Sequence, residues 1–129
     1  MLRKTKELGI DVVGVSFHVG SGCYDASAYT KAVSTARYVY DEGLKVGYRF
    51  TLLDIGGGFP GDKTLAITFE DIVPVMNAAL DEYFPTELGV EVISEPGQFF
   101  VNSSATLAVN VVSKRKIKPR SAEEQPVWH

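Results

Sequence analysis

Three short turns hold the side chains of this chain that are best suited to chemistry. His18 and Ser21 stand in one glycine-flanked turn, Gly56–Gly58 form a second, and Glu95 stands in a third. An imidazole and a carboxylate can bind a ligand or exchange protons with it, while glycines let backbone N–H groups approach an anion closely. A carboxylate at the end of a buried strand rarely lacks a partner. Glu95 is therefore the most suggestive single residue.

The turns recur at an almost constant interval. Phe17 precedes Ile55 by 38 residues, and Ile55 precedes Ser94 by 39. Repeated strand–loop–helix units have this period, and in a (β/α) barrel every such turn opens on the same rim. The spacing thus predicts that the three turns converge on one ligand.

Apolar runs before the turns predict the strands that position them. The runs cover 12–17, 50–55 and 90–94, and they lack strict alternation, as expected of parallel strands that are buried on both faces. Helical spacing of apolar residues predicts crossover helices over 29–40 and 72–83. Strand, helix, strand, helix, strand is the α/β pattern, and crossovers of this length require parallel neighbours.

Capping residues predict the helix ends. Asp25 is a plausible N-cap for the first helix, and Gly43 is placed to end it. Thr68 and Asp71 resemble a capping box for the second helix. Pro74 would remove a backbone donor inside that helix, which places the first turn nearer to Pro74.

The expected fold is part of a (β/α)8 barrel. A closed barrel needs about 250 residues, whereas this chain has 129, so we expect about half of one. Residues 106–113 are predicted to form a strand that leaves the barrel for a β-domain. The expected division is therefore barrel over 1–104, the start of the β-domain over 105–118, and a disordered tail over 119–129.

Composition narrows the classes of function. A formal net charge of −3 argues against nucleic acid as a partner, because proteins that bind it usually present a basic face. Cys23 is the only cysteine, which excludes an internal disulfide and favours a reducing compartment. No apolar run approaches ~20 residues, so no membrane span is expected, and a cytoplasmic location is predicted.

The glycine run and the two titratable side chains also allow other interpretations. Gly56–Gly61 satisfies the pattern G-x-G-x-x-G, but a dinucleotide site needs a helix that opens inside the motif. Residues 56–64 are close to a nucleotide P-loop, yet Asp62 breaks the spacing before Lys63. A plain structural turn also explains the glycines. His18 and Glu95 alone are too few ligands for zinc, so no metal is expected.

Taken together, the motifs resemble a known family. They are Val15–Cys23 (VSFHVGSGC), Leu53–Gly61 (LDIGGGFPG) and Ser94–Gly97 (SEPG). At these separations they are similar to eukaryotic ornithine decarboxylases, which have the alanine-racemase-like fold and bind pyridoxal phosphate. The similarity extends from about Leu8 to Lys116. The resemblance implies an eight-stranded barrel, of which this chain holds about the second half, followed by a β-domain, and a homodimer with shared active sites. It implies ornithine as substrate and putrescine as product, although the residues of this chain do not distinguish ornithine from arginine or lysine.

The resemblance also implies roles for individual residues. His18 would stack on the cofactor ring, Glu95 would pair with its pyridine nitrogen, and Ser21 with the backbone of Gly58 would hold the phosphate. His18 and Glu95 are the expected catalytic residues. The remaining expected contacts to the cofactor are Gly57, Pro96, Gly97 and Gln98.

One residue departs from the family pattern. Gln98 stands where the decarboxylases have arginine after Glu-Pro-Gly, so a neutral amide replaces a cation at the phosphate. The non-catalytic antizyme inhibitors share the fold and have also lost parts of the cofactor pocket, and an antizyme-binding regulator is the alternative hypothesis. By the family pattern the Schiff-base lysine lies upstream of this chain. We therefore expect no ornithine decarboxylation by the isolated polypeptide.

Overall fold

The computed structural model describes residues 1–63, 65–114, 116–117 and 127–128. Three parallel strands form a sheet in chain order, with Val15 opposite Leu53 and Leu53 opposite Val92. The strands are β1 (Gly14–Ser16), β2 (Leu52–Asp54) and β3 (Glu91–Ile93). The α/β class with a parallel sheet is confirmed, and each strand lies within its predicted range.

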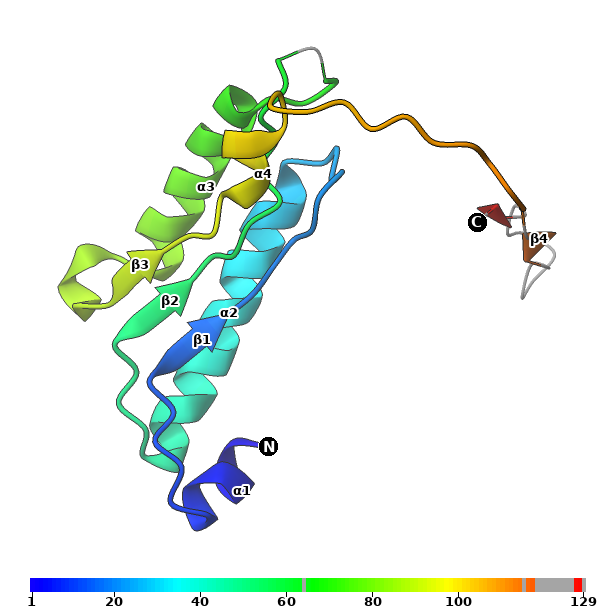
Figure 1. Ribbon diagram of the computed structural model, residues 1–129. Helices are drawn as coiled ribbons and strands as arrows, with labels where there is room; N and C mark the ends of the chain where they lie inside the picture. Colours follow the sequence, from blue (N-terminus) through cyan, green and yellow to red (C-terminus); the bar gives the residue numbers. More distant parts are fainter. Residues whose placement is uncertain (64, 115, 118–126, 129) are drawn as a thin grey trace, which may run out of the picture.

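Two long helices connect the strands and cover the same face of the sheet (Figure 1). They are α2 (Ser27–Val46) and α3 (Phe69–Tyr83). Three short helices complete this part of the chain: α1 (Leu2–Glu7), the 3-10 helix η1 (Thr86–Leu88) and α4 (Gly97–Val101). In Figure 1 no described element covers the opposite face of the sheet.

Helix α2 extends beyond its expected C-terminal end. The expectation that Asp25 is its N-cap is wrong by one residue, since Ala26 holds that position, but the Asp25 carboxylate accepts hydrogen bonds from the Ser27 amide (2.9 Å) and hydroxyl (2.7 Å). The expectation that Gly43 ends the helix is wrong, since Gly43 is a buried helical residue whose missing side chain makes room for the Phe50 ring. Gly47, with φ of 92°, ends the helix instead.

The capping box of α3 is confirmed. The Thr68 amide and hydroxyl both donate to Oδ2 of Asp71 at 2.8 Å. The amide of Thr68 is the larger of the two causes that hold the pKa of Asp71 below its ordinary value. The expected shift of the helix start toward Pro74 is wrong. The box fixes the start at Phe69, and Pro74 lies exposed inside the helix.

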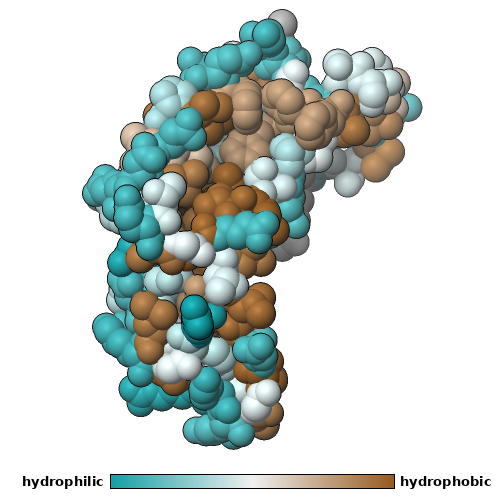
Figure 2. Space-filling model, turned by 90° about the vertical axis from the view of Figure 1, so that its left-hand side faces the viewer, coloured by the Kyte–Doolittle hydropathy of each residue, from teal (hydrophilic) through white to brown (hydrophobic). Residues whose placement is uncertain are grey.

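The core lies between the helix-covered face of the sheet and helices α2 and α3. Tyr29, Leu53 and Ile72 are its largest fully buried side chains. Aromatic rings join the layers. Tyr40 on α2 contacts Phe50 before β2 and Phe84 after α3, with ring centroids 5.8 and 5.6 Å apart. Apolar side chains also gather at the centre of the face shown in Figure 2, which is the side on which α3 and β3 lie in Figure 1.

The strand expected over 106–113 does not form. Residues 105–114 are extended but have no paired strand, and Leu107 and Val111 are 85% and 86% exposed. An isolated strand leaves its backbone donors and acceptors without partners, so alternation alone does not make one. Beyond this segment, β4 (Lys116–Ile117) pairs antiparallel with β5 (Val127–Trp128).

Of the residues expected to form a disordered tail, 119–129, the structure describes 127–128, which form β5. The rest of that expectation lies outside the described residues.

Tyr29 provides a test of the packing around the second turn. Its side chain is fully buried and stacks on Phe59 at 5.7 Å, yet its hydroxyl has no hydrogen-bond partner among the described residues. The same burial raises the pKa of Tyr29. Tyr29→Phe keeps the ring and removes the unpaired hydroxyl, so the free energy of unfolding in urea should rise, by about 1 kcal/mol.

Tyr48→Phe is the matched control. The Tyr48 hydroxyl lies 2.8 Å from Oγ1 of Thr5 and donates to the Ile10 carbonyl at 3.2 Å. This variant should therefore lower the free energy of unfolding. Equal losses in both variants would contradict the assignment of the Tyr29 hydroxyl as unpaired.

Candidate functional site

The three predicted turns meet at one end of the sheet, where β1, β2 and β3 end (Figure 1). The Gly57 N–H donates to Nδ1 of His18 at 3.1 Å, which joins the first turn to the second. The Glu95 N–H donates to the Gly56 carbonyl at 2.7 Å, which joins the third turn to the second. The convergence expected from the spacing is therefore made by main-chain contacts around Gly56 and Gly57.

The three glycines are required sterically as well as conformationally. A Cβ on Gly56 would overlap the Phe17 carbonyl, and one on Gly57 would overlap the Glu95 carbonyl. Gly58 has φ of +88°, and its Cβ would lie 2.6 Å from the Gly20 carbonyl carbon. Each glycine thus allows another turn to approach closely. A plain structural turn would not need glycine for this reason.

His18 and Glu95 lie on the open side of the sheet. Val15, Phe17 and Val19 pack against the core, and because side chains alternate along an extended chain, His18 faces the other way. Ser94 and Pro96 line a pocket on the helix side, which places Glu95 on the same side as His18. Both side chains are exposed. Among the described residues neither forms an ion pair, so both are available to a ligand.

The expected phosphate-binding residues also lie beside these turns. Ser21 is exposed, and its amide nitrogen lies 3.0 Å from the position of a Cβ on Gly58. Gln98 and Gly58 both line a polar pocket of about 250 Å³. Within the described part of the chain, the buried Oε1 of Gln98 has no hydrogen-bond partner. This oxygen is an acceptor and calls for a donor, so only the Nε2 end of the same amide could donate to a phosphate.

Backbone hydrogen bonds determine which of the predicted residues can donate to a ligand. The Gly57 N–H is engaged by His18. The Gly97 N–H donates to the Glu95 carbonyl at 2.8 Å, and Pro96 has no N–H. Among the residues of the glycine-bearing turns, Gly58 and Ser21 are therefore the better placed main-chain donors.

Asp54 is a site residue that the sequence analysis did not single out. Its Oδ1 accepts the Gly56 N–H at 2.8 Å, which fixes the start of the glycine turn. An aspartate two residues before a turn glycine often makes this contact, so the signal was present in the sequence.

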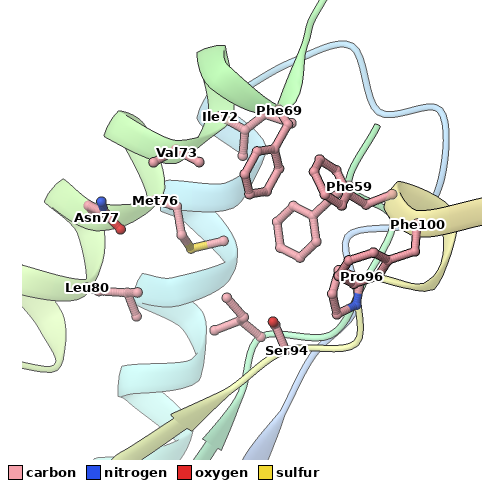
Figure 3. A pocket seen from close by; sticks show the side chains of 12 residues that line it. Phe59, Phe69, Ile72, Val73, Met76, Asn77, Leu80, Ser94, Pro96 and Phe100 are labelled. Carbon is pink, nitrogen blue, oxygen red and sulfur yellow. The ribbon is translucent and has the colours of Figure 1, made fainter. Parts of the chain in front are cut away.

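Helix α4, which carries Gln98, borders an apolar pocket of about 240 Å³ on the helix side of the strand ends (Figure 3). Phe99 packs on Phe69 of α3 with ring centroids 4.6 Å apart, and Phe69 meets Phe59 edge-on at 5.8 Å. The pocket separates α3 from the end of β3. The ring contacts around it fix α4 relative to α3.

The structure disfavours the alternative nucleotide sites. Helix α3 begins at Phe69, eight residues after the last glycine of the motif, so no helix N-terminus opens inside it as a dinucleotide site or a P-loop requires. The described residues include no cluster of three potential metal ligands. Nor does the described part of the chain contain a helix with the length and hydropathy of a bilayer span.

Comparison with known proteins gives consistent matches. Residues 1–102 match the family model described as pyridoxal-dependent decarboxylase, pyridoxal binding domain. The chain is 52% identical to ornithine decarboxylase of Mus pahari over 127 residues, covering 96% of this chain and 28% of that protein. It is 49% identical to antizyme inhibitor 2 of Xenopus laevis over 125 residues, covering 97% and 27%.

Solved structures give the same result. The arginine decarboxylase of Paramecium bursaria Chlorella virus superposes with a TM-score of 0.69 at 36% identity, covering 77% of this chain and 26% of that one. The chain thus spans about a quarter of the length of the relatives it matches.

The convergence of the turns can be tested through Gly58. Gly58→Ala places a methyl group against the Gly20 carbonyl at a positive φ, and should lower the free energy of unfolding by about 1–3 kcal/mol. Gly97→Ala is the control because its Cβ would meet no atom within 4 Å. Urea unfolding measures both variants. Equal stability of Gly58→Ala and the parent chain would show that the first and second turns do not approach as described.

Proposed function

Because the chain belongs to the pyridoxal-dependent decarboxylase family, we propose that its three turns form part of the pyridoxal phosphate site of an ornithine decarboxylase. The observation that carries this proposal is the main-chain junction that brings His18, Gly57 and Glu95 together. The identity to ornithine decarboxylases supports ornithine as the substrate and putrescine as the product.

The residues present fit the cofactor. Turns whose glycines leave no room for a Cβ expose main-chain donors, and Gln98, whose Nε2 can donate to an anion, lines the same pocket as Gly58. We propose that Ser21 and the backbone of Gly58 hold the phosphate, with the Gln98 amide beside it. Gly57, Pro96 and Gly97 would shape this cradle, since none of them offers a free N–H.

The two catalytic residues of the proposal are His18 and Glu95. His18 would stack on the pyridine ring, and the Glu95 carboxylate would face the ring nitrogen. When bound, pyridoxal phosphate supplies an electron sink for the carbanion that decarboxylation leaves, as long as its ring nitrogen is protonated. A neighbouring carboxylate favours that charged form. Glu95 therefore contributes to the reaction by holding a proton on a nitrogen of the cofactor.

The proposed setting of the site is a (β/α)8 barrel. Parallel strands in chain order with all turns at one end support residues 1–104 as part of such a barrel. Residues 105–118 would begin a β-domain. A cytoplasmic homodimer with shared active sites is the assembly that we propose for the complete enzyme.

Gln98 favours a second candidate function. A neutral amide holds a phosphate less tightly than a guanidinium does, and the match to antizyme inhibitor 2 is nearly as close as the match to ornithine decarboxylase. An antizyme-binding regulator without decarboxylase activity is therefore the alternative.

A segment exchange tests the catalytic proposal. Residues 1–114 of this chain would replace the corresponding segment of the Mus pahari ornithine decarboxylase, and carbon dioxide release from ornithine would be measured. We expect activity that Glu95→Gln lowers about 10²–10³-fold, because the ring nitrogen loses its stabilising charge. Full activity of the Glu95→Gln chimera would refute the role of Glu95. An inactive chimera that Gln98→Arg does not restore would favour the regulator.

Cofactor affinity tests the role of Gln98 separately. Gln98→Arg should tighten pyridoxal phosphate binding to the chimera by about tenfold, because a charged hydrogen bond replaces a neutral one. Titration followed by the cofactor's absorbance gives the dissociation constants. Thr35→Arg adds the same charge on the exposed surface of α2 and should leave them unchanged. Equal effects of the two substitutions would show that Gln98 does not face the phosphate.

A further inference from the structure

His18 receives a hydrogen bond that constrains the chemistry of its ring. The donor is the main-chain N–H of Gly57, and the acceptor is Nδ1, 3.1 Å away. A backbone amide has no lone pair to offer here, so Nδ1 must supply one and cannot carry a proton. From this contact we infer that Gly57 is a positioning residue, which holds His18 as the neutral tautomer with its proton on Nε2.

The Gly57 amide is itself held in place, so it cannot turn away from the ring. On one side, the N–H of Gly56 donates to Asp54 at 2.8 Å and the Gly56 carbonyl accepts from Glu95 at 2.7 Å. On the other side, the missing side chain of Gly57 lets the Glu95 carbonyl and the His18 ring approach, with Cε1 of His18 3.3 Å from the position of a Cβ. The turns that follow β2 and β3 thus fix the imidazole of His18, which lies in the turn after β1.

A ring with one tautomer has one donor left, which is the Nε2–H. Within the described part of the chain no group accepts it, so it remains for a ligand. A ring orientation that is fixed before binding also lowers the entropic cost of binding a ligand. This consequence rests on the proposed function: Gly57 would act on the cofactor through the His18 ring and not through its own N–H.

The tautomer can be observed directly in the 129-residue chain by ¹⁵N nuclear magnetic resonance of the histidine rings. The sequence has two histidines, and His129→Gln assigns the remaining signals to His18. Well above the ordinary histidine pKa of about 6.5, we expect a single neutral form with a protonated Nε2. A protonated Nδ1, or a rapid mixture of both tautomers, would overturn the inference.

Substitutions separate positioning from general stability. Gly57→Ala should lose the single tautomer, whereas Thr35→Ala, on the exposed surface of α2, should keep it. If Gly57→Ala does not fold, His18→Phe serves in its place, because it keeps an aromatic ring and removes the acceptor. The Gly57 amide should then exchange with solvent about fivefold faster. Unchanged exchange would refute the hydrogen bond.

None of these measurements needs a cofactor. A single Nε2–H tautomer in a chain whose chimera binds no pyridoxal phosphate would retain the positioning role and refute the proposed function. A mixture of tautomers in a chain whose chimera binds pyridoxal phosphate would refute the positioning role and retain the proposed function.

Discussion

Three main-chain turns approach one another closely at the carboxyl ends of β1, β2 and β3, and the candidate site is built on this approach. Gly56, Gly57 and Gly58 each face the backbone of another turn at a distance that leaves no room for a Cβ. Two hydrogen bonds then close the junction, from the Gly57 N–H to the His18 ring and from the Glu95 N–H to the Gly56 carbonyl. Residues in separate turns are thereby joined through main-chain donors, so the site does not depend on long flexible side chains.

The remainder of the fold positions the three turns of this junction. Parallel pairing in chain order places the three turns at the same end of the sheet, and the aromatic core between the sheet and helices α2 and α3 fixes the strands. Phe99 holds α4 against Phe69 and so positions Gln98 next to the glycines. A neutral amide holds a phosphate less tightly than a guanidinium would, and for this reason we propose a regulator as the alternative to an enzyme.

Much of this arrangement could be predicted from the sequence, because it depends on periodicity and on glycine. The apolar runs located all three strands of the parallel sheet, and the repeat of 38 and 39 residues indicated that the turns converge. Two of the predictions that failed depended on contacts between distant residues. Gly43 does not end α2 because the Phe50 ring occupies the space of its side chain. Residues 106–113 form no strand because no neighbouring strand pairs with them. The bond from Gly57 to His18 joins residues 39 apart and has no local signal.

If the three turns contact one ligand, titrating the ¹⁵N-labelled chain with pyridoxal phosphate will show it in the backbone amides. We expect the amide signals from residues 18–22, 56–58, 95, 97 and 98 to move together with one dissociation constant, while those of the exposed surface of α2 stay in place. Shifts that are confined to one turn, or that follow different dissociation constants in different turns, would contradict it.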